Sequence, residues 1–209
     1  SFSLGTGFNN KVYASLLQPD GKILVAGSFT QFNGTAVGRL VRLNPDGSRD
    51  SSFTSSPGAT NSIIYDMALQ SDGSIFLVGS FTNFNGTAVN RIVKILPNGA
   101  VDTSFVIGSG ASGLIEKIAL QSDGKIIIGG GFTSFNGSSV GKIARLNTDG
   151  TLDTSFITGV GLDDNVSAIG VQADGKIILG GSFTTYNGNV ANKIVRVNTD
   201  GTLDASFAS

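Results

Sequence analysis

The sequence predicts an all-β fold built from four copies of one structural unit. A stretch that begins with glutamine recurs as QPDGKILVAGSFT, QSDGSIFLVGSFT, QSDGKIIIGGGFT and QADGKIILGGSFT. The copies start at Gln18, Gln70, Gln121 and Gln172, so they follow one another after 52, 51 and 51 residues. A fixed period of about this size is typical of repeat architectures. Thirty glycines and a single glutamate argue against long helices, because glycine costs about 1 kcal/mol relative to alanine inside a helix.

Each copy contains four segments that are rich in strand-forming residues. In the first copy they are 12–17, 22–29, 39–43 and a short segment that ends at Phe53. Asp-Gly or Asn-Gly pairs stand between them, and both residue types tolerate the positive φ of tight hairpin turns. Each copy is therefore expected to be a four-stranded antiparallel meander. The turn pairs of the first copy are Asp20-Gly21, Asn33-Gly34 and Asp46-Gly47.

The second segment of each copy is apolar at nearly every position, as in Ile126-Ile127-Ile128. Both faces of this strand should therefore be covered by neighbouring units. Radial stacking of four-stranded units is the signature of a β-propeller. We predict a β-propeller of four four-stranded antiparallel blades, with a stacked linear array of β-repeats as the alternative. The expected single repeat domain covers 1–209, with units at about 3–53, 54–105, 106–156 and 157–207.

The repeated pattern also resembles a known family. It reads Q-x-D-G-K-I-x-x-G-G-x-F-T-x-[FY]-N-G, then a basic residue, R-L-N-x-D-G and D-x-S-F. This resembles the delta-60 tandem repeat of large bacterial surface and secreted proteins, and the resemblance covers all four copies. The second copy departs most, with Ser74 in place of lysine and Leu96-Pro97-Asn98-Gly99 at the later turn. The resemblance implies a propeller-like fold and a bacterial extracellular or cell-surface location, but no agreed activity.

Composition narrows the possible functions. The net charge is −1 and charged residues make up 14% of the chain, so no footprint for nucleic acid or an anionic membrane is expected. Histidine and cysteine are absent, which removes the commonest general base and the thiolate nucleophile. Glu116 is alone, and Asp163-Asp164 is an unrepeated pair that is expected to be solvated. We therefore predict that the protein is not an enzyme and has no cofactor.

Targeting signals are also lacking in the sequence. No apolar run of about 20 residues could cross a bilayer, and no basic-plus-apolar leader is present. Membrane insertion is therefore not expected. The chain begins in mid-pattern at Ser1-Phe2, so we expect any targeting sequence to lie elsewhere.

Three series of aromatic residues recur in register. Two are predicted to pack between units: Phe29, Phe81, Phe132 and Phe183, and Phe53, Phe105, Phe156 and Phe207. The third stands directly before Asn-Gly in the longest loop, where an aromatic face beside an amide could stack on a sugar. The alternative, which we favour, is that this ring folds inwards as a plug. The candidate ligand-binding residues are Phe32, Asn33, Phe84, Asn85, Phe135, Asn136, Tyr186 and Asn187.

Oxygen-bearing side chains alternate around a glycine in the turn that follows the third segment, as in Asn44-x-Asp46-Gly47-Ser48. Such alternation is found in calcium loops, but the spacing is not that of an EF-hand. An Asx-capped hairpin turn is the interpretation that we favour over a metal site. The calcium alternative would use Asp46, Asp149 and Asp200 as ligands.

A basic residue stands in the middle of the third segment of every unit, where an unpaired charge would be costly. An aspartate just across the next turn is the natural partner. The expected pairs are Arg42 with Asp50, Lys94 with Asp102, Arg145 with Asp153, and Arg196 with Asp204.

The predicted function is a non-catalytic extracellular scaffold or adhesin, and the alternative is a lectin-like module that binds a carbohydrate or another ligand. A protein or a cell-surface glycan is the expected partner. Because Ser-Phe occurs five times, Ser1-Phe2 and Ser3-Leu4 could supply a strand edge to the blade that ends at Phe207. Within one chain this contact would close the ring and remove exposed sheet edges, which we favour. Between chains it would give head-to-tail self-association.

Overall fold

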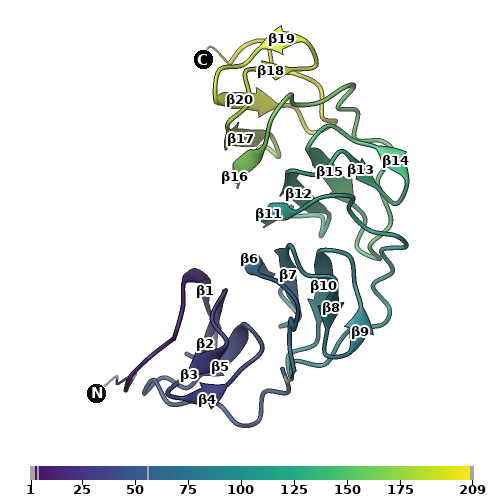
Figure 1. Cartoon of the computed structure of the whole chain (residues 1–209). Helices are drawn as coiled ribbons and strands as arrows, with labels where there is room; N and C mark the ends of the chain where they lie inside the picture. The colour runs from purple at the N-terminus through teal and green to yellow at the C-terminus, as the bar shows by residue number, and fades with distance from the viewer. Residues whose placement is uncertain (1–2, 4, 56, 208–209) are drawn as a thin grey trace. The chain divides into compact units, whose positions relative to one another are not determined.

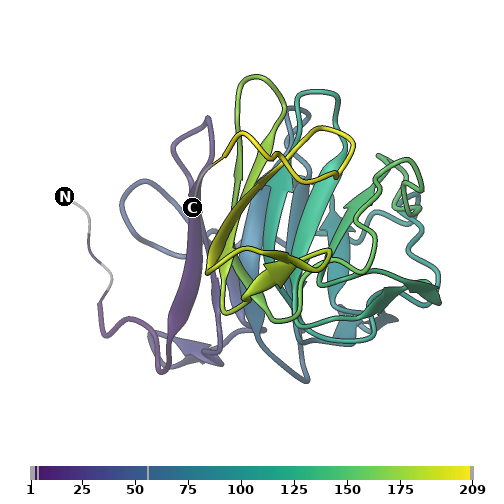
Figure 2. The same cartoon turned by 90° about the horizontal axis from the view of Figure 1, so that it is seen from above.

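The computed structural model describes residues 3, 5–55 and 57–207, and every element in this part of the chain is a strand, turn or loop. No helix is drawn for it (Figures 1 and 2). Consequently, the described residues include no helix that could span a membrane. The chain divides into two compact units, 1–103 and 104–209, each of which holds two of the repeats. The proposed strand edge at Ser1, Phe2 and Leu4 lies outside the described residues.

In the first unit, each repeat forms a three-stranded antiparallel sheet with the second strand in the middle (Figure 1). The sheet of the first repeat has the order β1-β2-β5, and that of the second has the order β6-β7-β10. These strands are β1 (Val12–Leu17), β2 (Ile23–Gly27), β5 (Leu40–Leu43), β6 (Ile64–Leu69), β7 (Ile75–Gly79) and β10 (Ile92–Ile95).

The second unit repeats this arrangement with the orders β11-β12-β15 and β16-β17-β20. Its strands are β11 (Ile115–Leu120), β12 (Ile126–Gly130), β15 (Ile143–Leu146), β16 (Val166–Val171), β17 (Ile177–Gly181) and β20 (Ile194–Val197). The first strand of every repeat carries a register shift near its start, as between Ile115 and Lys117.

The Asn-Gly pairs sit where the sequence predicts turns, but each closes a small hairpin of its own within the loop after the second strand. Asn33 and Gly34 both adopt positive φ, 48° and 74°, as a two-residue hairpin turn requires. The hairpins are β3 (Gln31–Phe32) with β4 (Thr35–Ala36), β8 (Asn83–Phe84) with β9 (Thr87–Ala88), β13 (Ser134–Phe135) with β14 (Ser138–Ser139), and β18 (Thr185–Tyr186) with β19 (Asn189–Val190).

The fourth strand of the predicted meander is reduced to a single bridged residue, Arg49 opposite Leu43 in the first repeat. One more hydrogen bond follows, from the N–H of Asp50 to the carbonyl of Arg42. Then the Asp50 side chain accepts hydrogen bonds from both the N–H and the hydroxyl of Ser52. This Asx turn ends the pairing and directs the chain towards the next repeat. The equivalent bridges pair Val101 with Ile95, Leu152 with Leu146, and Leu203 with Val197.

Consecutive sheets pack face to face within each unit and share one apolar core. In the first unit Leu24, Leu40 and Phe53 of repeat 1 pack with Ile64 and Leu77 of repeat 2. In the second unit Ile143 and Phe156 pack in the same way with residues of repeat 4. The predicted core phenylalanines are confirmed as buried except for Phe207, which is partly exposed. Those buried are Phe29, Phe53, Phe81, Phe105, Phe132, Phe156 and Phe183.

Candidate functional site

A carboxylate with several donors is the most elaborate polar feature of each repeat. In repeat 3, Asp153 Oδ2 lies 2.7 Å from Arg145 Nε and 2.7 Å from Lys125 Nζ. Its Oδ1 accepts hydrogen bonds from the N–H of Ser155 at 3.0 Å and from its hydroxyl at 2.6 Å. The Arg145 guanidinium also lies over the Phe156 ring, 4.7 Å from the centroid. Every acceptor of this buried aspartate is thereby occupied.

The same cluster recurs in the other repeats, so the predicted basic–acidic pairs are confirmed. Arg42 and Asp50 are 2.8 Å apart, Arg196 and Asp204 are 2.7 Å apart, and both aspartates also receive a lysine. Repeat 2 carries Ser74 at the lysine position, and there Lys94 and Asp102 are 3.2 Å apart. Sequence analysis missed the lysine that follows the first turn, although its recurrence in three repeats was a usable signal. The lysines are Lys22, Lys125 and Lys176.

The electrostatics of these clusters favour the ionised carboxylate. Burial by itself would raise the pKa of Asp153, but hydrogen bonds from Lys125, Ser155 and Arg145 outweigh it and hold the pKa well below its usual value. The pKa of Asp50 is lowered in the same way against the effect of burial. A carboxyl group that stays ionised and fully hydrogen-bonded cannot serve as a general acid near neutral pH. We conclude that the clusters are structural.

The Asn-x-Asp-Gly turns use their oxygen atoms within the turn. Asp46 Oδ1 accepts hydrogen bonds from the N–H of Ser48 at 2.9 Å and from its hydroxyl at 2.7 Å. Asn44 directs its amide N–H towards that same hydroxyl, at 2.9 Å. Hydrogen bonds from Ser48 lower the pKa of Asp46. Among the described residues, no group of three or more acidic side chains could hold a metal ion. This geometry is that of an Asx-capped turn.

The aromatic residues of the Asn-Gly loops do not face solvent. Phe32, Phe84, Phe135 and Tyr186 are at most 2% exposed, and the Tyr186 hydroxyl donates a hydrogen bond to the carbonyl of Gly201. The rings fill the space between the small hairpin and the main sheet, because the alternation along a two-residue strand places them inwards. They offer no face on which a sugar could stack, so a ligand-facing aromatic is not observed at these four positions.

The loop asparagines are occupied as well, although their loops are exposed. Each carbonyl oxygen accepts a backbone N–H from the segment that leads into the repeat, and this contact ties that segment to the hairpin. The partners are Gly7 for Asn33, Gly58 for Asn85, Ser109 for Asn136 and Val160 for Asn187.

The acidic pair of the third linker is also used locally. Asp163 accepts hydrogen bonds from the hydroxyl and N–H of Thr184 and from the N–H of Thr185, and these bonds lower its pKa. Asp164 accepts the N–H of Asn165. Glu116 accepts a 3.3 Å hydrogen bond from Asn165, while burial raises its pKa. No hydrogen bond joins Asp163, Asp164 and Glu116 to one another among the described residues, and each accepts from a threonine or from Asn165.

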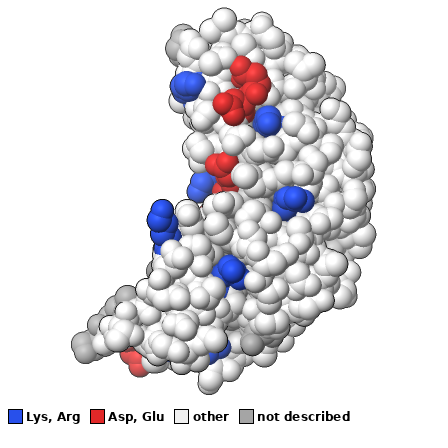
Figure 3. Space-filling view, in the orientation of Figure 1, with Lys and Arg blue, Asp and Glu red and all other residues white. Residues whose placement is uncertain are grey.

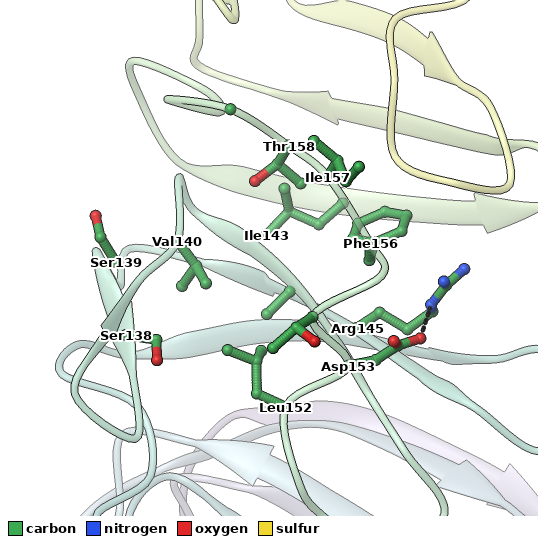
Figure 4. A pocket seen from close by; sticks show the side chains of 13 residues that line it. Ser138, Ser139, Val140, Ile143, Arg145, Leu152, Asp153, Phe156, Ile157 and Thr158 are labelled. Carbon is green, nitrogen blue, oxygen red and sulfur yellow. Dashed lines mark hydrogen bonds and ion pairs between the residues drawn. The ribbon is translucent and has the colours of Figure 1, made fainter.

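A cavity of about 280 Å³ lies along the outer side of β15 in repeat 3, beside the segment that leads to repeat 4. Val140, Ile143 and Ile157 give it an apolar lining, with Ser138 and Ser139 at one end. Arg145 and Asp153 lie at the opposite end, paired with each other (Figure 4). A smaller hollow of about 170 Å³ occupies the equivalent place in repeat 1. The lining is mainly apolar, and its two charged residues, Arg145 and Asp153, are already paired with each other.

A second cavity, of about 260 Å³, separates the first turns of repeats 3 and 4. Gln121 and Gln172 line it, and the side-chain oxygen of each is buried without a hydrogen-bond partner. The same holds for Gln18 and Gln70 in the first unit. A buried acceptor of this kind needs a donor, and ordered water is the usual one. The burial of this side-chain oxygen in each copy was not recognised from the sequence.

The four repeats share the same sheet, the same small hairpin and the same basic–acidic pair, and they coincide with four matches to one family model. The model of a family described as a domain of unknown function, the DUF5122 beta-propeller, matches residues 18–53, 70–105, 121–156 and 172–207. The chain belongs to the DUF5122 beta-propeller family. The predicted all-β propeller fold is thereby confirmed, and with it the resemblance to a propeller-like repeat family. Among curated proteins, none matches the sequence.

Solved propellers resemble the chain in fold. A protein of unknown function from Bacteroides caccae gives a TM-score of 0.52 at 15% identity, over 92% of this chain and 65% of that one. The WD40 β-propeller domain of Doa1 gives 0.55 at 16%, over 83% and 49%. Virginiamycin B lyase from Staphylococcus aureus gives 0.53 at 17%, over 95% and 57%. The chain thus spans 49% to 65% of their lengths. At such identities the likeness shows the fold alone.

Proposed function

We propose that the DUF5122 chain is a non-catalytic scaffold or adhesin module of an extracellular bacterial protein. The observation that carries this proposal is that the recurring aspartates and loop asparagines are hydrogen-bonded within the repeats. Asp153, Asn136 and Asp149 each accept hydrogen bonds from neighbouring side chains or backbone. Because these recurring residues stabilise the fold, we expect the module to act through contacts of its surface and not through a catalytic site.

The chemistry at the cavity beside β15 supports the same proposal. An enzyme needs a nucleophile or a base with a pKa suited to proton transfer near the working pH. The cavity beside β15 offers serine and threonine hydroxyls without a base, and its only carboxylate is held ionised by Lys125, Ser155 and Arg145. The sequence contains no histidine or cysteine that could supply one. At 17% identity, the similarity to virginiamycin B lyase concerns the fold alone.

The outer surface fits a partner that is recognised by shape and by uncharged polar groups. The second strands of the small hairpins, such as Ser138–Ser139 and Asn189–Val190, are exposed. Figure 3 shows a face on which charged side chains are sparse among uncharged ones. Such a surface gives little long-range attraction, so contacts would be short-ranged and insensitive to salt.

A glycan array combined with a bead-adhesion assay tests the proposal. Beads that carry the chain should adhere to protein-coated or cell-coated surfaces more than beads that carry an unrelated β-protein, and free sugars should not compete. The glycan array should show no saccharide-specific binding. Binding of one sugar that is lost in Asn136→Ala, while the melting temperature is retained, would replace the scaffold with the lectin-like function. Adhesion no greater than that of the control beads would contradict the adhesin role.

A further inference from the structure

In an Asn-Gly pair the asparagine side chain can react with the backbone nitrogen that follows it, because glycine has no Cβ atom to shield that nitrogen. The chain contains five such pairs. One of them, Asn98-Gly99, lies in the turn that follows β10 in repeat 2. The others form the turns of the small hairpins: Asn33-Gly34, Asn85-Gly86, Asn136-Gly137 and Asn187-Gly188. The structure holds the pair at Asn98 differently from these four.

The four hairpin asparagines are tied to other segments of the chain. Each has a positive φ of 47° to 49°, and each side-chain oxygen accepts an N–H from a residue 26 or 27 positions away. Asn85 also donates its amide N–H groups to the carbonyls of Thr54 and Gly99, at 3.1 and 3.2 Å. A reaction at these side chains therefore requires the hairpin and its anchoring segment to separate first.

Asn98 is exposed, and its φ is negative. Its side-chain oxygen accepts a hydrogen bond, at 3.0 Å, from the N–H of Ala100 in the same turn. Gly99 donates its N–H to the carbonyl of Leu96 at 2.8 Å. Both bonds lie inside the turn, so opening of the turn alone releases the Asn98 side chain and the Gly99 nitrogen together.

The same turn is held by fewer side chains than its equivalents. In repeat 1 the Ser48 hydroxyl joins Asn44 to Asp46 through hydrogen bonds of 2.9 and 2.7 Å. A threonine hydroxyl joins the equivalent pair in repeats 3 and 4. Repeat 2 has Leu96 and Ala100 at these positions, and neither side chain can form a hydrogen bond. The turn of repeat 2 therefore opens more easily than the other three.

The peptide group between Asn98 and Gly99 is polarised by the neighbouring repeat. Both the N–H and the hydroxyl of Thr54 donate hydrogen bonds to the main-chain carbonyl of Asn98, each at 2.8 Å. When the Gly99 nitrogen loses its proton, negative charge develops on this carbonyl oxygen, where the two fixed donors stabilise it. The contact with repeat 1 therefore favours the reactive, deprotonated form of the Gly99 nitrogen.

We propose that Asn98 is a site of spontaneous deamidation through a cyclic succinimide. Hydroxide removes the Gly99 N–H proton, and the nitrogen attacks Cγ of Asn98. A Cγ–N bond forms while the bond from Cγ to Nδ2 breaks, and Nδ2 leaves as ammonia after taking a proton from water. Water then opens the ring. Addition at Cγ gives aspartate, and addition at the main-chain carbonyl carbon gives isoaspartate, in which the backbone runs through Cγ. The net reaction consumes one water molecule and releases one ammonia.

The two products differ in their consequences for the fold. Aspartate is the residue that the other three repeats carry at this position, as Asp46, Asp149 and Asp200. Isoaspartate adds one carbon to the main chain of the turn, whose carbonyls at Pro97 and Asn98 accept hydrogen bonds from Arg42 and Thr54 of repeat 1. The reaction therefore either gives repeat 2 the carboxylate of the other turns or alters its contact with repeat 1. Neither outcome depends on the scaffold proposal.

Peptide mapping by mass spectrometry, after incubation of the folded chain in mildly alkaline buffer, tests the proposal. Asn98 should convert to a mixture of aspartate and isoaspartate several-fold faster than each of the four hairpin asparagines. A sample digested before incubation corrects for conversion during the mapping itself. Equal rates at all five sites, or a hairpin asparagine that converts faster than Asn98, would overturn the proposal.

Two variants test why the structure selects Asn98. Asp149→Asn creates an Asn-Gly pair in the turn of repeat 3, where Asn147 and Thr151 supply the side-chain hydrogen bonds. This new amide should deamidate several-fold more slowly than Asn98 in the same chain. The double variant Leu96→Asn/Ala100→Ser gives the turn of repeat 2 the side chains of repeat 1, and it should slow the reaction at Asn98 by a similar factor.

Melting temperatures are measured for both variants, so that only folded chains are compared. Equal rates at Asn98 and at the amide introduced by Asp149→Asn would overturn the structural argument. An unchanged rate at Asn98 in a double variant that keeps its melting temperature would do the same. If the double variant loses its fold, the comparison of the five sites within the wild-type chain still decides the proposal.

Discussion

At the residue scale, one aspartate per repeat organises the polar interior. Asp153 ends the short fourth segment through its turn with Ser155, neutralises Arg145 and receives Lys125. Arg145 in turn reaches the carbonyl of Thr199 in the next repeat. A single carboxylate therefore links the strand, the turn and the neighbouring sheet. Such a pair, buried and fully hydrogen-bonded, is costly to break because the remaining charge stays uncompensated.

Asp153→Asn should lower the free energy of unfolding by roughly 3 kcal/mol, because Arg145 and Lys125 then lack a negative partner. Thermal or urea unfolding at pH 7 measures the loss. Asp123→Asn is the matched control, since Asp123 is exposed and accepts only a turn hydrogen bond from Lys125 N–H. Equal losses for the two variants would show that the buried cluster contributes no more to the free energy of unfolding than an exposed turn aspartate does.

Stability should also fall in acid. Since the folded pKa of Asp153 lies below its unfolded value of about 3.9, the carboxylate stabilises the fold fully above that value. This contribution is lost progressively as the pH drops below about 4 and through the lowered folded pKa. Asp50 and Asp204 act in the same direction. Melting temperatures measured from pH 7 to pH 2 should therefore decline below pH 4, and Asp153→Asn should make the decline shallower. Parallel curves for the two proteins would contradict this assignment.

A long basic side chain occupies the left-handed region once in every repeat. Lys142 has φ 68°, a conformation that costs a residue with a Cβ atom about 1–2 kcal/mol. Lys142→Gly should relieve this cost and raise stability by up to about 1 kcal/mol, because glycine gives back part of the gain as entropy of the unfolded chain. Lys142→Ala keeps the Cβ atom and should not stabilise. A glycine variant no more stable than the alanine variant would mean that the Lys142 side chain compensates for its backbone. The equivalent residues are Arg39, Arg91 and Lys193.

At the element scale, the sequence predicted strands and turns well but overestimated the fourth strand. Asp-Gly and Asn-Gly pairs carry their own conformational signal, so each turn was found where it was expected. The fourth segment looked like a strand because Leu152 and Phe156 are apolar. Phe156 is buried, however, by leaving the sheet and packing over the turn glycine of the next repeat, Gly201. Because that contact lies between two repeats, the hydrophobic pattern within one repeat cannot predict it.

The linker to repeat 4 crosses the backbone closely at Gly141, just before β15. A Cβ atom at Gly141 would lie 2.2 Å from the carbonyl oxygen of Val160 and 2.3 Å from the Cα of Gly161. Gly141→Ala should therefore destabilise by at least about 2–3 kcal/mol, since backbone atoms must move. Gly137→Ala is the control: its Cβ meets nothing within 4 Å, and only the positive φ of 78° costs about 1 kcal/mol. Chemical denaturation of both variants would rank the two effects, and the reverse order would refute the close approach.

At the scale of the whole molecule, the composition and the repeat period were sufficient to predict an all-β, propeller-like repeat fold. The candidate site was less accessible. Phe32 and Asn33 looked suited to a sugar because the sequence of a loop does not show whether an aromatic ring points to solvent or to the core. Only the packing of the small hairpin turns the ring inwards and places the Asn33 side-chain oxygen where it accepts the N–H of Gly7. The burial of equivalent residues was also not predictable from the sequence, since Leu40 is fully buried whereas its equivalent Ile194 is 41% exposed.

In a repeat protein, the contribution of an interface residue to stability depends on whether a neighbouring repeat packs against it. Phe156 and Phe207 are equivalent, but Phe156 is buried over Gly201 of the next repeat, whereas Phe207 is partly exposed. Phe156→Ala should thus cost about 3–4 kcal/mol of unfolding free energy, as for other buried phenylalanines. Phe207→Ala should cost roughly 1 kcal/mol or less, because its ring is only partly buried. Losses of the same size for the two variants would show that the difference in burial does not decide what each phenylalanine contributes.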